Sequence, residues 1–487
     1  MTKAIVAGVE VDTRHFIGGE RVESAETFPD HSPIDGAFLA DIHRGGKREV
    51  DMAMAAAKAA FPIWSKMTPQ ERGVILHRVA DLVEERIEEL SIVETTDNGS
   101  LLRSHRRGVM PRVAMNFRFF ADYAMNQLSY PDFDTRGHRN HVTWDPTGVV
   151  GVITPWNAPL MLATWRIGPA LAAGDTVVAK PPEWTPLTAS LLADITVEAG
   201  MPPGVFNVVQ GYGEEAGAAL TSHPDLSRIS FTGSVPTAKL VARAAADNLV
   251  PCSFELGGKS PLIITDDADL DIAVTVAVEQ YDNAGQVCLS GTRILVQRGI
   301  ADAFKAAFIE KAQQIKQGDP RDLETDIGPQ VHPDHFARVK GFVDRAASEG
   351  QNIVMGGGPN ADLGGNFFKP TLIDNPTPGS EIATQEVFGP VLVMQQFDTD
   401  EQAIQMANDT EFGLAAVLIC GDKARAEAIT EHLVAGTVWV NCFFVRDLGA
   451  PFGGSKKSGI GREGGIWSFD FYADVKNTVF APNGWKE

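Results

Sequence analysis

One cysteine of this chain has surroundings suited to covalent catalysis. Cys288 lies in the segment NAGQVCLS at 283–290, after an apolar stretch that predicts a long helix from about Asp269 to Gly285. A thiol just past a helix end and before a strand lies where catalytic side chains are often displayed. Its thiolate would be a nucleophile. The alternative for a lone cysteine is a small, buried structural residue.

A glutamate upstream in the chain is the candidate partner of this thiol. Glu255 stands between Phe254 and Leu256-Gly257-Gly258, where burial of a carboxylate costs free energy unless the group has a role. The paired glycines allow another group to approach closely. A half-buried carboxylate with a raised pKa is a suitable general base near pH 7. The alternative is a solvated glutamate at the end of a strand.

A series of short motifs accompanies these residues. Each motif alone is weak to moderate evidence, but their order along the chain is very specific. The chain resembles the aldehyde dehydrogenase superfamily over essentially its whole length. The motifs that carry the resemblance are ITPWN at 153–157, KPPE at 180–183, FTGS at 231–234, ELGGK at 255–259, GQVC at 285–288, EVFGP at 386–390 and PFGG at 451–454.

The resemblance implies a fold and a reaction. The fold would be α/β, with a Rossmann-like cofactor domain, an α/β catalytic domain and a small β ribbon for oligomerisation. The thiolate of Cys288 would attack an aldehyde carbon and form a thiohemiacetal, whose oxyanion needs preorganised donors. Asn157 and the backbone N–H of Cys288 would supply them. Hydride would pass to a nicotinamide, and Glu255 would activate water to hydrolyse the resulting thioester.

The resemblance also implies that the cofactor is NAD. The turn at Gly233-Ser234, at a helix N-terminus, would face the pyrophosphate. Lys180 and Glu183 would reach the adenosine ribose, and Glu386 the nicotinamide ribose. A strict GxGxxG motif is absent, because the glycines at 211–217 have different spacing. The predicted cofactor contacts are Ile153, Thr154, Pro155, Trp156, Asn157, Lys180, Pro182, Glu183, Gly213, Gly217, Phe231, Thr232, Gly233, Ser234, Leu256, Gly257, Glu386 and Phe388.

Two arginines indicate the class of substrate. The segments 111–120, 445–448 and 458–465 look like the (hydroxy/amino)muconate semialdehyde dehydrogenase branch, whose substrates carry a carboxylate far from the aldehyde. Arg112 and Arg446 could clamp that carboxylate, since guanidinium matches its geometry. Structural ion pairs are an equally weighted alternative. The resemblance also implies a substrate tunnel, which Trp165 and Phe117 would line. Core packing is an alternative for Phe117.

The elements that position these residues alternate along the chain. Short apolar runs at 149–153, 176–179, 205–209 and 228–231 are separated by helical segments, as parallel βαβ units require. A second alternating block runs from 261 to 440. The first hundred residues are expected to be helical after a short strand near 16–19. Within them, Thr68-Pro69-Gln70-Glu71 is a capping box that opens a helix ending near Asn98-Gly99.

These patterns and the resemblance together divide the chain. Residues 1–126 and 147–254 are assigned to the NAD-binding domain and residues 255–453 to the catalytic domain. Residues 127–146 and 472–484 resemble the family's oligomerisation ribbon. An exposed strand edge is a template for pairing with another subunit, so a homodimer or homotetramer is expected.

The net charge and the apolar content of the chain limit the kinds of binding partner that are expected. The net charge of −21 disfavours nucleic acid and anionic membranes, and no stretch approaches the ~18 apolar residues of a membrane helix. The N-terminus does not resemble a signal peptide, so a cytoplasmic location is expected. None of the 4 cysteines has CxxC spacing, and no metal site is expected.

Other functions remain as alternatives. The substrate could be an apolar aromatic or aliphatic aldehyde. A CoA-acylating dehydrogenase would pass the acyl group to CoA, but Glu255 argues for water. A non-catalytic binding protein on the same fold would have no need of Cys288 and Glu255. No histidine neighbours Cys288 in the sequence, which disfavours a thiol protease.

Overall fold

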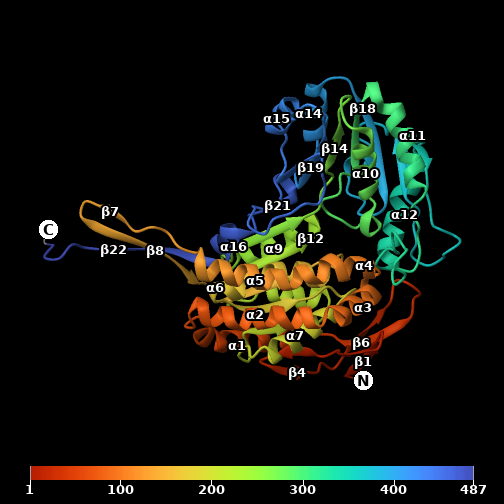
Figure 1. Ribbon diagram of the computed structural model, residues 1–487. Helices are drawn as coiled ribbons and strands as arrows, with labels where there is room; N and C mark the ends of the chain where they lie inside the picture. The colour runs from red at the N-terminus through yellow and green to blue at the C-terminus, as the bar shows by residue number, and fades with distance from the viewer. Residues whose placement is uncertain (1, 486–487) are drawn as a thin grey trace.

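A computed structural model describes residues 2–485 of the protein (Figure 1). Its largest element is an 8-stranded sheet in the order β21-β13-β12-β9-β10-β11-β3-β4. The strands from β13 to β11 are parallel, and the apolar runs of β9 and β10 are buried throughout. These strands are β9 (Val149–Ile153), β10 (Thr176–Lys180), β11 (Phe206–Val208), β12 (Leu226–Gly233) and β13 (Cys252–Leu256).

Helices cover both faces of this sheet, which explains why its central strands are continuously apolar. One apolar core joins a face to α2, α5, α6, α7 and α16, and a second core joins the other face to α1, α8 and α9. The covering helices are α1 (Lys47–Trp64), α2 (Pro69–Glu85), α5 (Met110–Asn126), α6 (Pro159–Ala173), α7 (Leu187–Glu198), α8 (Ala218–Thr221), α9 (Val235–Ala246) and α16 (Gly465–Tyr472).

A 7-stranded sheet in the order β16-β17-β18-β15-β14-β19-β20 forms the second layer, above the first in Figure 1. Only β16 is antiparallel to its neighbour. The α/β prediction is therefore confirmed. The strands are β14 (Pro261–Ile264), β15 (Arg293–Gln297), β16 (Asn352–Met355), β17 (Thr371–Asp374), β18 (Val391–Phe397), β19 (Ala415–Ile419) and β20 (Thr437–Val440).

Helices flank this second sheet as well. Side chains of α10 and α11 share one apolar core with it, and α14 and α15 share another on the opposite face. The helices of this layer are α10 (Leu270–Glu279), α11 (Ala301–Ala312), α12 (Pro333–Ser348), α13 (Glu381–Thr384), α14 (Asp400–Asn408) and α15 (Lys423–Glu431).

A third sheet projects from the body at the left of Figure 1. It consists of β7 (Phe133–Thr135), β8 (His138–Pro146) and β22 (Ala473–Phe480), all antiparallel, with β22 at one edge. These strands come from the two segments expected to form a ribbon. Among residues 2–485, no helix has both the length and the apolar character needed to cross a bilayer.

The short strand expected near 16–19 is present at His15–Ile17, but the prediction that the rest of the first hundred residues is helical is wrong for the other residues of 3–43. They form strands, and the first helix begins only at Lys47. Positive φ angles at Ala7 and Gly8 and at Gly18 and Gly19 produce tight hairpin turns there. The strands are β1 (Lys3–Val6), β2 (Val9–Asp12), β3 (His15–Ile17), β4 (Glu20–Val22), β5 (Thr27–His31) and β6 (Phe38–His43).

Two predicted helices also differ from the structure. The capping box at Thr68 and Glu71 is present, but the helix breaks at Arg86, and α3 (Ile87–Asn98) continues to the left-handed Gly99. Helix α10 ends at Glu279, well before Gly285. The boundary drawn between 254 and 255 falls within β13, which continues to Leu256.

Candidate active site

The site lies where the two large sheets meet. Strand β13 ends at Leu256 and β14 begins at Pro261, so the segment 257–260 connects the carboxyl edge of the first sheet directly to the amino edge of the second. Lys180 and Gly233 are the last residues of their parallel strands at that same carboxyl edge. Ligands of open α/β sheets bind outside the carboxyl ends of the strands.

The loop that carries Cys288 has an unusual backbone. Asn283, Ala284 and Gly285 follow one another with φ angles of 49°, 54° and 73°. A Cβ on Gly285 would lie 2.1 Å from the carbonyl oxygen of Gly389, so only glycine fits there. The α10 helix cannot continue to this point. The loop instead turns back and places Cys288 just before β15.

Asn157 is hydrogen-bonded to this loop at the first left-handed residue and at the residue that follows the last one. Its Nδ2 donates to the carbonyl of Gln286 at 2.9 Å, and its own carbonyl accepts from Asn283 Nδ2 at 3.1 Å. Ser100 Oγ in turn donates to Asn283 Oδ1 at 2.8 Å. The amide of Asn157 has a second N–H, which neither of these hydrogen bonds uses.

Two carboxyl groups and one guanidinium group lie close enough to Cys288 to shift the pKa of its thiol. Burial raises the pKa of the thiol to about 12, and the carboxylates of Glu386 and Glu255 add to that effect, while Arg446 opposes it. The thiol is therefore neutral at pH 7 in this state. Attack on an aldehyde requires a base that accepts its proton.

Glu255 lies in β13 with 5% of its surface exposed, and neither carboxyl oxygen has a hydrogen-bond partner among the described residues. Burial, then the nearby Glu463 carboxylate, holds the pKa of Glu255 well above its usual range. A Cβ on Gly453 would lie 2.8 Å from Glu255 Oε1, so the glycine keeps this side open. Glu255 can thus hold a proton near neutral pH.

Glu463 is a site residue that the sequence did not single out. Its Oε2 accepts from Trp165 Nε1 at 2.5 Å and lies 3.3 Å from Arg166 Nη2. In the sequence, its segment carries only the resemblance to the semialdehyde branch. Glu463 comes near enough to Glu255 to raise its pKa, because the short strand β21 (Gly459–Ile460), just before Glu463, pairs with β13. No local pattern indicates such a pairing.

The predicted cofactor residues line the carboxyl edge of the first sheet. Lys180 is buried, and its Nζ lies 2.9 Å from Glu183 Oε2. Ser234 is the N-cap of α9, and its hydroxyl accepts from the backbone N–H of Thr237. The side chain of Lys180 passes 3.7 Å from where a Cβ on Gly217 would lie. The turn at Gly213–Gly217 is a single π-helical turn.

Glu386 reaches the same edge from the second sheet. The backbone N–H of Gly258 donates to its Oε1 at 2.9 Å, and a Cβ on Gly257 would lie 1.9 Å from its Oε2. Burial raises the pKa of Glu386 to about 7 against the opposing effects of this N–H, Arg338 and Lys259. The ring of Phe388 contacts Trp156, with centroids 5.3 Å apart.

The remaining predicted cofactor residues surround these groups. Ile153, Phe231 and Leu256 are buried in the core on one face of the first sheet. Thr154 donates its N–H to the carbonyl of Lys180. The others, which follow or end the same strands, are Pro155, Pro182, Thr232 and Gly233.

The two candidate clamp arginines lie over one aromatic ring. The guanidinium carbons of Arg112 and Arg446 are 5.5 Å and 5.2 Å from the ring centroid of Trp165. Arg446 also lies 3.7 Å from the ring of Phe452. Phe117 is fully buried in the core between the helices, so core packing accounts for its position.

Comparisons with known proteins agree with this geometry. The model of the aldehyde dehydrogenase family matches residues 21–478. The 2-hydroxymuconic semialdehyde dehydrogenase of Pseudomonas sp. (strain CF600) is 43% identical over 483 residues, which cover 96% of this chain and 99% of that protein. The 2-aminomuconic semialdehyde dehydrogenase of Danio rerio is 41% identical over 473 residues, covering 96% and 97%.

A solved structure shares the whole architecture. The crystal structure of an indole-3-acetaldehyde dehydrogenase complexed with NAD+ superposes with a TM-score of 0.95 at 38% identity, covering 97% of each chain. The resemblance inferred from the ordered motifs is confirmed: the chain belongs to the aldehyde dehydrogenase family.

Proposed function

We propose that this aldehyde dehydrogenase uses NAD to oxidise a semialdehyde that carries a carboxylate at its far end, through a thioester on Cys288. The single observation that carries the choice of substrate is the pair Arg112 and Arg446. Both guanidinium groups face Trp165, and neither has a carboxylate within 4.0 Å in the part of the chain that the structure describes.

Arg112 and Arg446 are two partly buried cations close to each other, and a nearby negative charge would offset their repulsion and their loss of hydration. Burial, and secondly the charge of Arg446, lower the pKa of Arg112 to about 10. Ion pairs within the protein, the alternative for these arginines, are absent for both among residues 2–485. A carboxylate of the substrate would add a negative charge at ion-pair distance and could bind each guanidinium through two hydrogen bonds.

The residues of this chain can perform the covalent steps. Cys288 Sγ forms a bond to the aldehyde carbon as its proton leaves toward a nearby base, for which Glu255 is the candidate. Asn157 Nδ2 and the backbone N–H of Cys288 stabilise the oxyanion. Glu255 releases the proton from Cys288 to solvent and then, as a carboxylate, removes a proton from the water that attacks the thioester. The C–S bond breaks, the thiolate of Cys288 leaves and the carboxylic acid is released.

The carboxyl edge of the first sheet fits NAD. NAD, when bound there, would supply the acceptor for the hydride that leaves the carbon attached to Cys288. Glu183 and Glu386 would hold the two riboses, and the first turn of α9 would face the pyrophosphate. Gly257, which has no room for a Cβ beside Glu386, keeps the carboxylate against the backbone. The NAD+ complex of the related indole-3-acetaldehyde dehydrogenase supports this assignment.

The relatives support the same substrate class. Two proteins more than 40% identical to this chain are named for 2-hydroxymuconic and 2-aminomuconic semialdehydes. These names describe those proteins. They make a semialdehyde with a distal carboxylate the first substrate to test here.

The test uses pairs of aldehydes that differ only in a distal carboxylate, with NADH absorbance as the readout. We expect the carboxylate to raise kcat/KM, and Arg112→Met to lower it roughly 10-fold or more for the charged aldehyde only. Arg446→Met should lower it for both aldehydes, because Arg446 also lowers the pKa of Cys288, but more for the charged one. Arg118→Met is the matched control, because Arg118 lies on the same helix as Arg112 but pairs with Asp81 and Glu84.

Equal kcat/KM for both members of each pair, unchanged in Arg112→Met, would instead favour an apolar aldehyde. A product that forms only when CoA is added would show that CoA replaces water as the acyl acceptor.

A further inference from the structure

Side chains of helix α12, in the second layer, form hydrogen bonds with the backbone of the loop that carries Glu386. Arg338, on α12, donates from Nη2 to the carbonyl of Glu386 at 2.8 Å and from Nη1 to the carbonyl of Val387. His335 Nε2 lies 2.7 Å from the carbonyl of Phe388. Two side chains one turn apart thus satisfy the carbonyls of consecutive residues.

The histidine must be the donor in this contact, because a carbonyl oxygen can only accept. His335 is 5% exposed, and burial lowers its pKa to about 4. Its ring is therefore neutral at pH 7, with the proton on Nε2. The ring of Trp156 contacts both His335 and Phe388, at centroid distances of 4.8 Å and 5.3 Å.

The loop needs partners outside itself. Phe388 has a φ angle of 59°, in the left-handed region that a residue with a side chain rarely adopts. Its neighbour Gly389 presents a carbonyl to Gly285 so closely that a Cβ there would lie 2.1 Å from it. The loop 386–389 therefore connects α12 on one side to the nucleophile loop on the other.

We propose that Arg338 and His335 are positioning residues that hold the loop 386–388 so that the Glu386 carboxylate stays against the Gly257-Gly258 backbone, where it binds the nicotinamide ribose. This inference rests on the proposed function. The hydrogen bonds from these two residues go to backbone carbonyls of the loop, and the centroid of the His335 ring lies 6.1 Å from that of Phe388. They therefore act through the loop that carries Glu386 rather than on the substrate.

The proposal predicts a selective defect in the use of NAD. Arg338→Met leaves two carbonyls without these donors, so we expect KM for NAD to rise roughly 5- to 30-fold, with a smaller change in kcat. Arg338→Lys keeps one donor and should recover part of the loss. Arg345→Met is the control. Arg345 lies on the same helix and packs on the same Phe342 ring, but it pairs with Glu381.

His335 offers a second, independent substitution. The amide of His335→Gln can still donate to the carbonyl of Phe388, whereas His335→Leu cannot. We expect the leucine variant to raise KM for NAD and the glutamine variant to stay near the wild type. If the glutamine and leucine variants show the same NAD kinetics, the hydrogen bond to Phe388 does not position the loop.

Hydrolysis of p-nitrophenyl acetate separates this role from a general structural one. That reaction needs the thiol of Cys288 and water but no hydride acceptor, so Arg338→Met should retain it while NAD-dependent oxidation falls. Equal loss of both activities, or unchanged KM for NAD, would overturn the proposal. Failure of the wild-type enzyme to reduce NAD with any aldehyde would instead overturn the proposed function.

Discussion

Burial raises the pKa values of the two glutamates near Cys288. The pKa of Glu386 is raised to about 7, and that of Glu255 is held well above its usual range. A carboxyl group with a raised pKa releases its proton only as the pH rises toward that pKa. The basic form of Glu386 therefore increases through the neutral range, and that of Glu255 increases only above the usual range of a carboxyl group. At the scale of single residues, the burial of these carboxyl groups between the two sheets therefore sets the pH range in which they can act as bases.

Glu255→Gln isolates the hydrolytic step. The amide cannot accept a proton from water, so we expect a burst of about one NADH per subunit followed by a steady state slowed roughly 100-fold or more. In the wild type, the hydrolysis rate should rise with pH, because the basic form of Glu255 must accumulate. Stopped-flow NADH absorbance, recorded from about pH 5 to about pH 9, measures both the burst and the pH dependence.

Cys252→Ser is the control for this experiment. Cys252 lies in the same strand and only donates to the carbonyl of Val250, so its substitution should leave burst and steady state unchanged. Rapid, sustained turnover by Glu255→Gln would show that another group activates the water.

The residues of this site are easier to predict from the sequence than their surroundings. Cys288, Glu255 and Asn157 stand in ordered motifs, and the structure brings the first two close to Arg446. Glu463 and Arg338 carry no such signal. Glu463 pairs with side chains of α6 and Arg338 with backbone carbonyls, all far along the chain, and neither kind of contact leaves a periodic pattern.

At the scale of elements, local signals succeed where local interactions decide the structure. The capping box of α2 forms because its hydrogen bonds join residues three apart. The predicted end of α10 is wrong because a distant contact decides it. The carbonyl of Gly389 occupies the space beside Gly285, and the chain there takes left-handed angles that no helix contains. The strands at 3–43 differ from the prediction although their turns at Gly8 and Gly18-Gly19 are hairpin signals.

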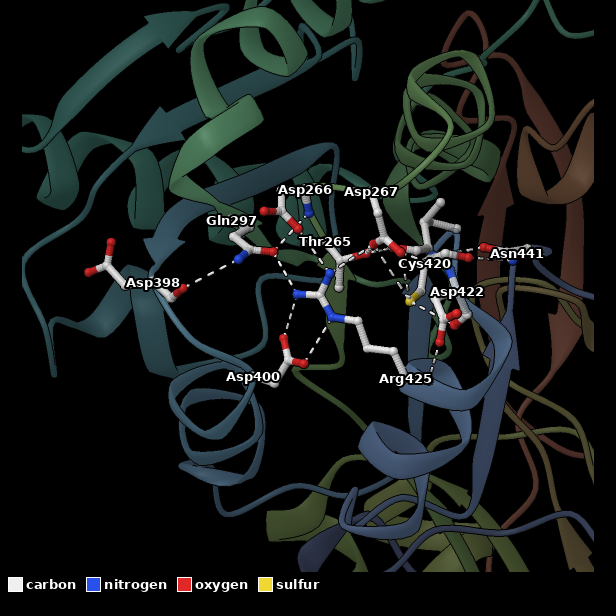
Figure 2. A network of polar contacts seen from close by, with 11 residues as sticks. Thr265, Asp266, Asp267, Gln297, Asp398, Asp400, Cys420, Asp422, Arg425 and Asn441 are labelled. Atoms are coloured by element: carbon white, nitrogen blue, oxygen red, sulfur yellow. Dashed lines mark hydrogen bonds and ion pairs between the residues drawn. The ribbon is translucent and has the colours of Figure 1, made fainter.

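A network of polar contacts secures α15 to the second sheet (Figure 2). The guanidinium of Arg425 contacts Asp266 and Asp267 at 2.9 Å after β14, and Asp400 at 2.6 Å at the start of α14. It also donates to Gln297 Oε1, at the end of β15, at 2.8 Å. One side chain thus joins two helices to the carboxyl ends of two strands.

Arg425→Ala should destabilise the second sheet. The side chain is only 22% exposed, and its removal leaves several acidic groups close together without a cation, so we expect a loss of roughly 1–3 kcal/mol. The measurement is the midpoint of urea unfolding followed by tryptophan fluorescence. Arg298→Ala is the control. Arg298 pairs with Asp398, but its side chain is 62% exposed, so its removal should change the midpoint little. Equal shifts in both variants would contradict the special role of Arg425.

At the scale of the whole molecule, the projecting sheet of β7, β8 and β22 extends away from the body of the protein (Figure 1). Strand β22 pairs with β8 on one side only, and its other edge has no strand beside it among residues 2–485. Val475 and Val479 are 55% and 54% exposed, and Phe480 is 44% exposed. An unpaired edge with exposed apolar side chains is typical of a surface that another subunit covers.

We therefore expect the protein to assemble through this ribbon into a homodimer or a homotetramer. Placing aspartates at both valines, as Val475→Asp with Val479→Asp, puts charges where apolar side chains would be buried between subunits, so the assembly should dissociate to a smaller species. Light scattering at micromolar concentration measures the mass. Val74→Asp is the control, because Val74 is 71% exposed on α2 and should leave the mass unchanged. A monomeric wild type would remove the basis of this prediction. An unchanged mass in the double variant would place the interface on another surface.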